Sequence, residues 1–161
     1  MRVRTILFAA LAALAACSPM AADAGQQAST AASARHSESG LEVVPLTMVS
    51  ANGRHAFRVE VARTSAEQAK GLMFRTAMGA NEGMIFPMDP ARQASFWMKN
   101  TVISLDLVFI GPDRRIESIA ANAVPYSLSP IPSKGNVSAV LELNGGRAAQ
   151  LGLAPGDRVE W

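Results

Sequence analysis

The sequence of 161 residues contains few of the side chains that build catalytic and metal sites. It has one cysteine, Cys17, and two histidines, His36 and His55. Zinc needs three or four Cys, His or acidic ligands, and no such spacing occurs. If Cys17 is acylated, as its context below indicates, the folded part has no thiol for a disulfide, a nucleophile or a thiolate ligand. We therefore expect no resident metal and no cofactor.

The common catalytic motifs are also absent. There is no Walker loop, no dinucleotide-binding glycine fingerprint and no G-x-S-x-G elbow. A Ser-His-Asp triad would have to use His55, which follows the tight turn at Asn52-Gly53 and is expected to be a solvated strand residue. These absences favour a protein that is not an enzyme.

A surplus of positive charge is missing as well. The 15 Lys and Arg residues oppose 13 Asp and Glu residues, but Arg2 and Arg4 lie in a segment that we expect to be removed. Without them, 13 basic residues balance 13 acidic ones. A nucleic-acid-binding protein needs excess Lys and Arg to displace counterions, so nucleic acid is excluded as a partner. With 49% hydrophobic residues, overall disorder is excluded too.

The N-terminus predicts export and lipid attachment. Arg2 and Arg4 precede an apolar run at residues 5–14, which is shorter than the roughly 20 residues of a membrane span. The segment 14–17, Leu-Ala-Ala-Cys, resembles the lipobox of bacterial lipoproteins, which implies cleavage before Cys17 and acylation of that residue. Plain secretion with cleavage after Ala24 is the alternative, although that site lies far from the apolar run.

The chain divides into three expected segments. Residues 1–16 form the signal peptide, residues 17–40 the lipidated cysteine and a flexible tether rich in Ala, Ser, Gln and Gly, and residues 41–161 a single globular domain. In Gram-negative lipoproteins an aspartate after the cysteine usually retains the protein at the inner membrane. Because Ser18 stands there, we expect a lipid-anchored protein at the periplasmic face of the outer membrane.

Residues 41–161 contain the turn and strand signals that are typical of a mainly β domain. Residues 41–62 are typical of a hairpin, because Asn52-Gly53 is a type I′ turn signal between two apolar runs. Thr64-Ser65-Ala66-Glu67 is a capping-box pattern, which predicts a short helix to about Lys70 that ends at Gly71. We expect further strands at 84–86, 96–99, 105–110, 115–121, 137–143 and 158–161, a loop at 125–134, and a turn with a short helix at 144–151.

Many short strands with only two short helices indicate a mainly β fold. We expect a small barrel-like or highly curved antiparallel sheet, with an α+β sandwich as the alternative.

Several motifs follow one another in a characteristic order: GLMFR (71–75), EGMIF (82–86), FWMKNT (96–101), LDL (105–107), VLELNGG (140–146) and LGLAPGDRV (151–159). The series resembles the uncharacterised family called domain of unknown function 192, over about residues 57–159. The resemblance implies a compact, mostly β prokaryotic domain, often exported or lipid-anchored, that carries no established activity.

Two acids stand out because their strands are apolar on both faces. Asp106 alternates with leucines in the strand 105–110, and Glu142 shares a strand face with Val140. A bare buried carboxylate costs several kcal/mol, so both need partners, and Arg75 and Lys99 are the candidates. The expected cluster is either a polar ligand pocket or an internal ion-pair network. The candidate ligand-binding residues are Arg75, Trp97, Lys99, Asn100, Thr101, Asp106 and Glu142.

These observations favour a cell-envelope lipoprotein that acts as a binding or accessory module. Its expected partners are the membrane, through the anchor, and a cell-wall component or another envelope protein. One alternative is a small hydrolase that uses Asp106 or Glu142. A second is a copper-handling protein, because thioethers bind Cu(I), although methionine is also the usual filler of irregular cores. The methionines concerned are Met73, Met78, Met84, Met88 and Met98.

Overall fold

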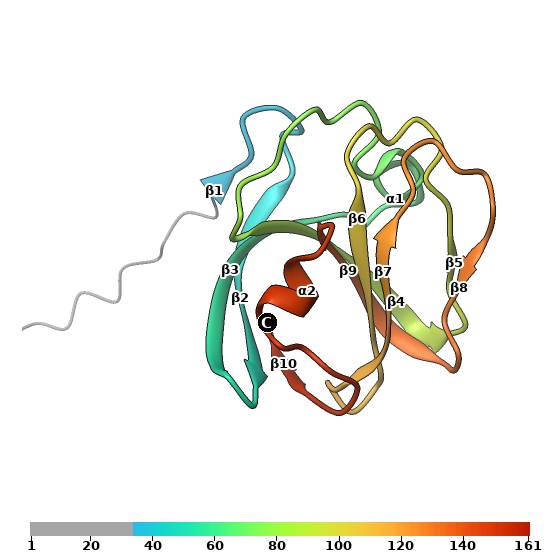
Figure 1. Cartoon of the computed structure of the whole chain (residues 1–161). Coiled ribbons are helices and arrows are strands. Elements are labelled where there is room, and N and C mark those ends of the chain that lie inside the picture. Colours follow the sequence, from blue (N-terminus) through green and yellow to red (C-terminus); the bar gives the residue numbers. More distant parts are fainter. Residues whose placement is uncertain (1–33) are drawn as a thin grey trace, which may run out of the picture. The chain divides into compact units, whose positions relative to one another are not determined.

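The computed structural model describes residues 34–161, shown in Figure 1. Cys17, the expected signal peptide and the first part of the expected tether lie outside the described residues. The elements are β1 (Ala34–Arg35), β2 (Glu42–Ser50), β3 (Gly53–Val61), α1 (Ser65–Lys70), β4 (Glu82–Arg92), β5 (Ser95–Phe96), β6 (Leu105–Ile110), β7 (Ile116–Ala123), β8 (Ile131–Pro132), β9 (Val137–Asn144), α2 (Arg147–Gln150) and β10 (Arg158–Glu160).

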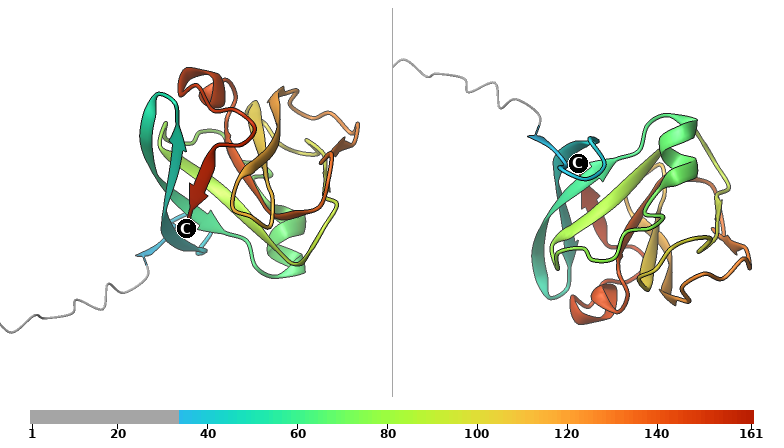
Figure 2. Two further views of the ribbon diagram at one scale, coloured as in Figure 1. Left: turned by 90° about the horizontal axis from the view of Figure 1, so that it is seen from below. Right: turned by 90° about the horizontal axis from the view of Figure 1, so that it is seen from above.

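Eight strands form one mixed sheet in the order β1-β2-β3-β4-β9-β6-β7, with β10 added beside β2. The pair β3–β4 is parallel, and the other ladders between residues 34 and 161 are antiparallel. The sheet curls strongly (Figure 2), and an isolated bridge joins Arg115, just before β7, to Arg158 of β10. No continuous ladder closes the described strands into a barrel. The prediction of a mainly β fold with two short helices is confirmed, with a mixed rather than purely antiparallel sheet.

The first hairpin and the first helix form where the sequence predicts them. Strands β2 and β3 pair up to Ser50 and Gly53, around the expected tight turn. The capping box is complete: the Glu67 backbone N–H donates to the Thr64 hydroxyl over 3.2 Å, and the Glu67 carboxylate accepts the Thr64 N–H over 2.8 Å. Backbone hydrogen bonds from Thr64 and Arg63 lower the pKa of Glu67. Gly71, with φ of 46°, ends the helix.

Strand β4 is longer than expected, since it continues from Glu82 through Pro87 and Pro90 to Arg92. The register with β9 shifts between Pro87 and Arg92, and such an irregularity accommodates residues that cannot donate to a ladder. The strand expected at 96–99 is reduced to β5, which pairs with β8 inside the segment expected to be a loop.

The folded part also begins earlier than the expected boundary at residue 41. Strand β1 pairs with β2 through Ala34–Val43 and Arg35–Glu42, and a backbone hydrogen bond of 2.8 Å from His36 to Leu41 closes the turn between them. Ala34 and Arg35, within the segment predicted to be a tether, therefore belong to the sheet.

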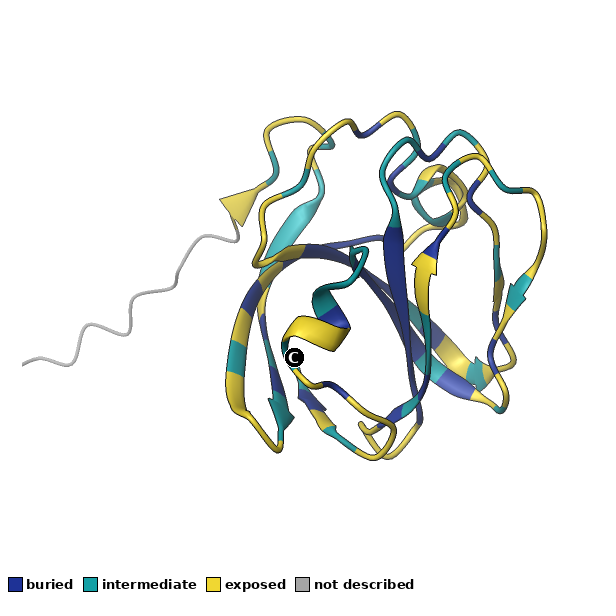
Figure 3. Cartoon of the chain, in the orientation of Figure 1, coloured by how far each residue is buried: buried dark blue, intermediate teal, exposed yellow. Residues whose placement is uncertain are grey.

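Strand β6 and most of β9 are buried along their length (Figure 3). Because successive strand residues point to opposite sides, both faces of the sheet are covered there. On β6, Val108 and Ile110 join one hydrophobic cluster, the first core, which also contains Ala148 of α2. Leu107 and Phe109 join the other cluster, the second core, which also includes Leu72, Met84, Phe86 and Met98. Among residues 34–161, no helix has the length and apolar character needed to cross a membrane.

Candidate functional site

A cavity of about 410 Å³ opens beside the second core. Its walls come from α1 and the residues after it, from β4 and β5, and from the loop that follows β5, while β9 contributes Glu142. The volume lies within the range of small-molecule sites, about 300–1,000 Å³. The polar or aromatic lining residues that concern us are Lys70, Arg92, Trp97, Lys99, Thr101 and Glu142.

Glu142 is the unusual group in this cavity. Its strand neighbours in register are Met84 on β4 and Leu107 on β6, so it lies between two apolar side chains. The residue is 5% exposed, and within residues 34–161 its carboxyl group has neither a hydrogen-bond partner nor an ion-pair partner. Desolvation by burial raises its pKa to about 8. At neutral pH the folded protein therefore presents a protonated carboxylic acid, which can donate a hydrogen bond into the cavity.

The motif around Lys99 forms one wall of the cavity. The Lys99 ammonium lies 5.2 Å from the centre of the Trp97 ring, at a distance that allows a cation–π contact. Trp97 is 50% exposed, whereas Thr101 is buried and donates its hydroxyl to the Lys99 carbonyl over 3.3 Å. Asn100 has φ of 55° and does not line the cavity, and its side-chain amide lies 3.9 Å from the Met73 sulfur.

Lys99 has no carboxylate partner among the described residues. Lys70 and Arg92 add two further cations to the lining, and sequence analysis missed both. Lys70 ends α1 directly before the GLMFR motif, so its position beside that motif was the available signal. Because Glu142 is protonated at neutral pH, the lining carries three positive charges and no negative one.

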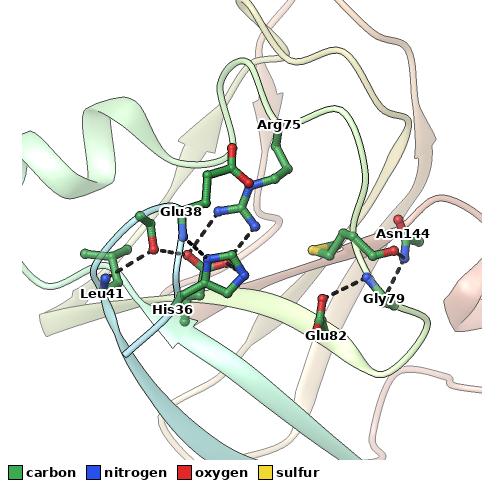
Figure 4. Close-up of polar contacts among 10 residues, drawn as sticks. His36, Glu38, Leu41, Arg75, Gly79, Glu82 and Asn144 are labelled. Atoms are coloured by element: carbon green, nitrogen blue, oxygen red, sulfur yellow. Dashed lines mark hydrogen bonds and ion pairs between the residues drawn. The ribbon is translucent and has the colours of Figure 1, made fainter. Parts of the chain in front are cut away.

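Arg75 is not part of this cavity, so the prediction that it joins Lys99 is wrong. Its guanidinium forms two hydrogen bonds with the Glu60 carboxylate, of 2.9 and 3.1 Å, and an ion pair of 3.0 Å with Glu38 (Figure 4). Ser39 donates its hydroxyl to Glu60, and the His36 ring lies 3.7 Å from the same carboxylate. Burial opposes the charged form, but Glu60 and Glu38 raise the pKa of Arg75 overall.

This arrangement explains why sequence reasoning assigned Arg75 to the wrong acid. Glu60 alternates with Val59 and Val61 along β3, a pattern that is typical of a solvent-facing side chain, yet it is 3% exposed. Residues 36–41 fold over it and complete its hydrogen bonding. Arg75 thus links the turn at residues 36–41 and the loop after α1 to Glu60 of β3.

Asp106 is also absent from the cavity. On β9, Glu142 pairs with Leu107, so both point to the second core, whereas Asp106 points to the opposite face of the sheet. Its carboxylate accepts backbone N–H groups from Asn122, Gly146 and Ala148, over 2.8–2.9 Å.

The carboxylate of Asp106 therefore fixes the start of α2, whose N-cap, Gly146, has no side chain to do so. The prediction that Asp106 gathers with Glu142 is wrong, because the strand register places the two acids on opposite faces. This placement excludes a hydrolase mechanism in which Asp106 and Glu142 act together as a carboxylate pair.

The methionines mainly fill the second core. Met84 and Met98 are fully buried there, Met88 is 7% exposed, and Met78 packs against the same cluster. In the stretch from residue 34 onward, no group of three or more His, Cys, Asp or Glu side chains is placed to hold a metal ion.

A curled mixed sheet with a small-molecule-sized cavity beside its second core defines the structural class of this domain. The model of the family DUF192, described as "Uncharacterized ACR", matches residues 47–161, and the chain belongs to this family. The comparison with curated proteins finds no match.

Two solved structures are similar to this chain. A protein of unknown function from Novosphingobium aromaticivorans DSM 12444 is 61% identical, with a TM-score of 0.79, and the match covers 82% of this chain and 94% of that one. A protein from Sinorhizobium meliloti 1021, described as a "putative transcription regulator", is 40% identical, with a TM-score of 0.72, over 74% of this chain and 94% of that one. The first match covers nearly all of that crystallised chain, so in that relative the matched extent is sufficient for folding.

Proposed function

We propose that this protein is a cell-envelope lipoprotein whose domain binds a small anionic, hydroxylated molecule in the cavity beside Trp97 and Lys99. The single observation that carries the proposal is Glu142: a buried, unpaired carboxylic acid with a pKa of about 8 that lines a cavity bordered by three cations. Buried polar groups are almost always hydrogen-bonded, so an unpaired one in a cavity points to an external partner.

The lining defines the chemistry of that partner. Lys70, Arg92 and Lys99 supply only positive charge, which favours a carboxylate or phosphate group. Protonated Glu142 donates a hydrogen bond to a hydroxyl or carbonyl oxygen, and the Thr101 hydroxyl, which donates to the Lys99 carbonyl, accepts one from a ligand hydroxyl. The half-exposed Trp97 ring offers a flat face on which a sugar ring packs. A cell-wall saccharide that bears an acid group combines these features.

A pair of matched saccharides tests this assignment. The described part of the chain, residues 34–161, is titrated by calorimetry with N-acetylmuramic acid and with N-acetylglucosamine, which lacks the lactyl carboxylate. We expect binding of the acidic sugar and at least tenfold weaker binding of the neutral one. Lys99→Met should remove the preference for the acid, whereas Lys134→Met, a change to an exposed lysine that does not line the cavity, should keep it.

Two kinds of result would count against the saccharide site. Equal affinity for both sugars, or binding that Lys99→Met leaves intact, would contradict an anion site at this cavity. Loss of binding in both lysine variants would indicate a general charge effect rather than a site.

The envelope location is tested separately. The proposal predicts that the mature protein begins at an acylated Cys17, anchored at the periplasmic face of the outer membrane, and mass spectrometry of the membrane fraction measures this directly. An unmodified chain that begins at Gly25 would contradict it. The relative described as a transcription regulator does not change the proposed partner, because the balanced charge of the mature chain disfavours nucleic acid.

A further inference from the structure

The exposed large apolar side chains of the described residues come from loops that are hydrogen-bonded to one another. In the part of the chain that the structure describes, five large apolar side chains are exposed, each by at least half. All five come from three loops, residues 71–78, 97–101 and 124–130. We call this set the apolar rim: Phe74, Trp97, Val124, Tyr126 and Leu128.

Backbone hydrogen bonds hold the three loops together, so the rim is one surface. The Phe74 N–H donates to Asn100 over 2.8 Å, the Met98 N–H to Ser127 over 2.9 Å, and the Tyr126 N–H to Thr101 over 3.2 Å. Figure 1 shows these loops at the upper end of the domain, around α1 and above β7. Contiguous exposed apolar groups on a soluble domain mark an interaction site.

Two of the exposed residues of the apolar rim have strained backbone conformations. Phe74 and Tyr126 adopt φ values of 66° and 60°, a region that bulky side chains rarely occupy. Their rings are 66% and 59% exposed, so burial of those rings does not offset the strain within the domain. The loops therefore maintain an unfavourable conformation at residues that present aromatic rings to the surroundings.

The charges around the rim indicate what it meets. The three loops contain no Asp or Glu, and Arg75 in the first loop is already paired with Glu60. Lys99 lies within the second loop, and Lys70 and Arg92 share a cavity with it and with Trp97. A groove of about 260 Å³ beside Trp97 and Leu128 is lined almost entirely by apolar side chains. The surface is thus apolar at the loop tips, cationic beside them and free of acids.

We propose that the apolar rim docks on an anionic lipid bilayer, with its aromatic rings at the headgroup level and Lys70, Arg92 and Lys99 facing the anionic headgroups. Aromatic side chains favour the membrane–water interface, and each nearby Lys or Arg adds attraction to an anionic surface. Docking would turn the cavity mouth toward the membrane. The surface borders the saccharide site and shares Trp97, Lys70, Arg92 and Lys99 with it, whereas Phe74 and Tyr126 do not line the cavity and belong to the docking surface alone.

The test uses the described part of the chain, residues 34–161, which lacks the apolar N-terminal segment and Cys17. Its binding is measured by sedimentation with vesicles of phosphatidylglycerol and phosphatidylcholine, and with vesicles of phosphatidylcholine alone. Trp161→Phe leaves Trp97 as the only tryptophan, and its emission should shift to the blue on the anionic vesicles.

The double change Phe74→Asn with Tyr126→Asn removes two rings at positions where asparagine tolerates a positive φ. We expect at least a tenfold lower partition coefficient. The near-ultraviolet circular dichroism spectrum, which reports the fold, should be unchanged aside from the contribution of the lost tyrosine. Lys99→Gln should lower binding to anionic vesicles about fivefold. The control Lys134→Gln, at an exposed lysine outside the three loops, should change it less than twofold.

Three results would overturn the proposal: no sedimentation of the unmodified domain with anionic vesicles, equal binding by the double variant, or a dimer in light scattering that the double variant dissociates. The last would show that the rim joins two copies of the chain. The double variant should still bind N-acetylmuramic acid if the cavity does, so failure of membrane docking and failure of the saccharide site are distinguishable.

Discussion

Replacement of Glu142 by glutamine should stabilise the protein at alkaline pH. Glutamine has nearly the same shape but never ionises. Burial raises the pKa of Glu142 from 4.5 to about 8, and each pKa unit corresponds to about 1.4 kcal/mol. Wild-type protein should therefore be less stable than Glu142→Gln above pH 8 by about 3–5 kcal/mol, a large part of a typical domain stability.

The sign follows from proton binding. Between about pH 4.5 and pH 8 the unfolded chain has lost the Glu142 proton while the folded chain keeps it. The folded state binds more protons, so the free energy of unfolding contributed by this group falls as pH rises through that window and is constant above it. Below this pH window, Glu142 is protonated in both the folded and the unfolded chain and is neutral, as glutamine always is. The free energy of unfolding of the variant should then match that of the wild type.

Urea unfolding of the two proteins at about pH 4, 6 and 9 measures the difference, and the titrations of all other groups cancel in the comparison. The acid point serves as the internal control for packing changes made by the amide. Free energies of unfolding that run parallel from pH 4 to 9 would refute the reasoning, because they would mean that Glu142 ionises in the folded state as it does in the unfolded state.

Two further substitutions test the residues that the structure assigns to stability. Arg75→Met should lower the free energy of unfolding by about 3–5 kcal/mol, because it leaves the carboxylate of Glu60 buried without its main partner, and thermal and urea unfolding would show it. A loss below about 1 kcal/mol would contradict that role. Asp106→Ala should cost a similar amount, because three backbone N–H groups lose their acceptor, and hydrogen exchange at Gly146 and Ala148 should accelerate. Unchanged exchange at these amides would contradict the capping role of Asp106.

Local signals in the sequence predicted most of the elements. The Asn52-Gly53 turn and the capping box that begins at Thr64 act over a few residues, and both formed as expected. The extent of β4 was not predictable, because a proline ends a strand unless a partner strand allows an irregular register, and that partner, β9, lies some fifty residues further along the chain.

The candidate site was predictable only in part, for the same reason. Trp97, Lys99 and Thr101 belong to one short motif and line one cavity, together with Glu142. The buried acids were recognised from their apolar strands, but the face that each acid occupies depends on the register of β6 against β9. Arg75 was paired with the wrong acid because its partner, Glu60, becomes buried only when residues 36–41 fold over it.

The parallel pairing of β3 and β4 has a consequence for the order of folding. Two parallel neighbours cannot be joined by a tight turn, so the chain between Val61 and Glu82 must travel back along the sheet. That return segment contains α1, Lys70 and the loop of Phe74, while Glu142 reaches the cavity through the contact of β9 with β4. Contacts between distant parts of a chain form slowly, because closing the loop between them costs conformational entropy. The hairpin β2–β3 joins strands that are close in sequence, whereas the cavity exists only after the pairing of β4 with β9 is made. Ligand capture during refolding would therefore report that long-range pairing.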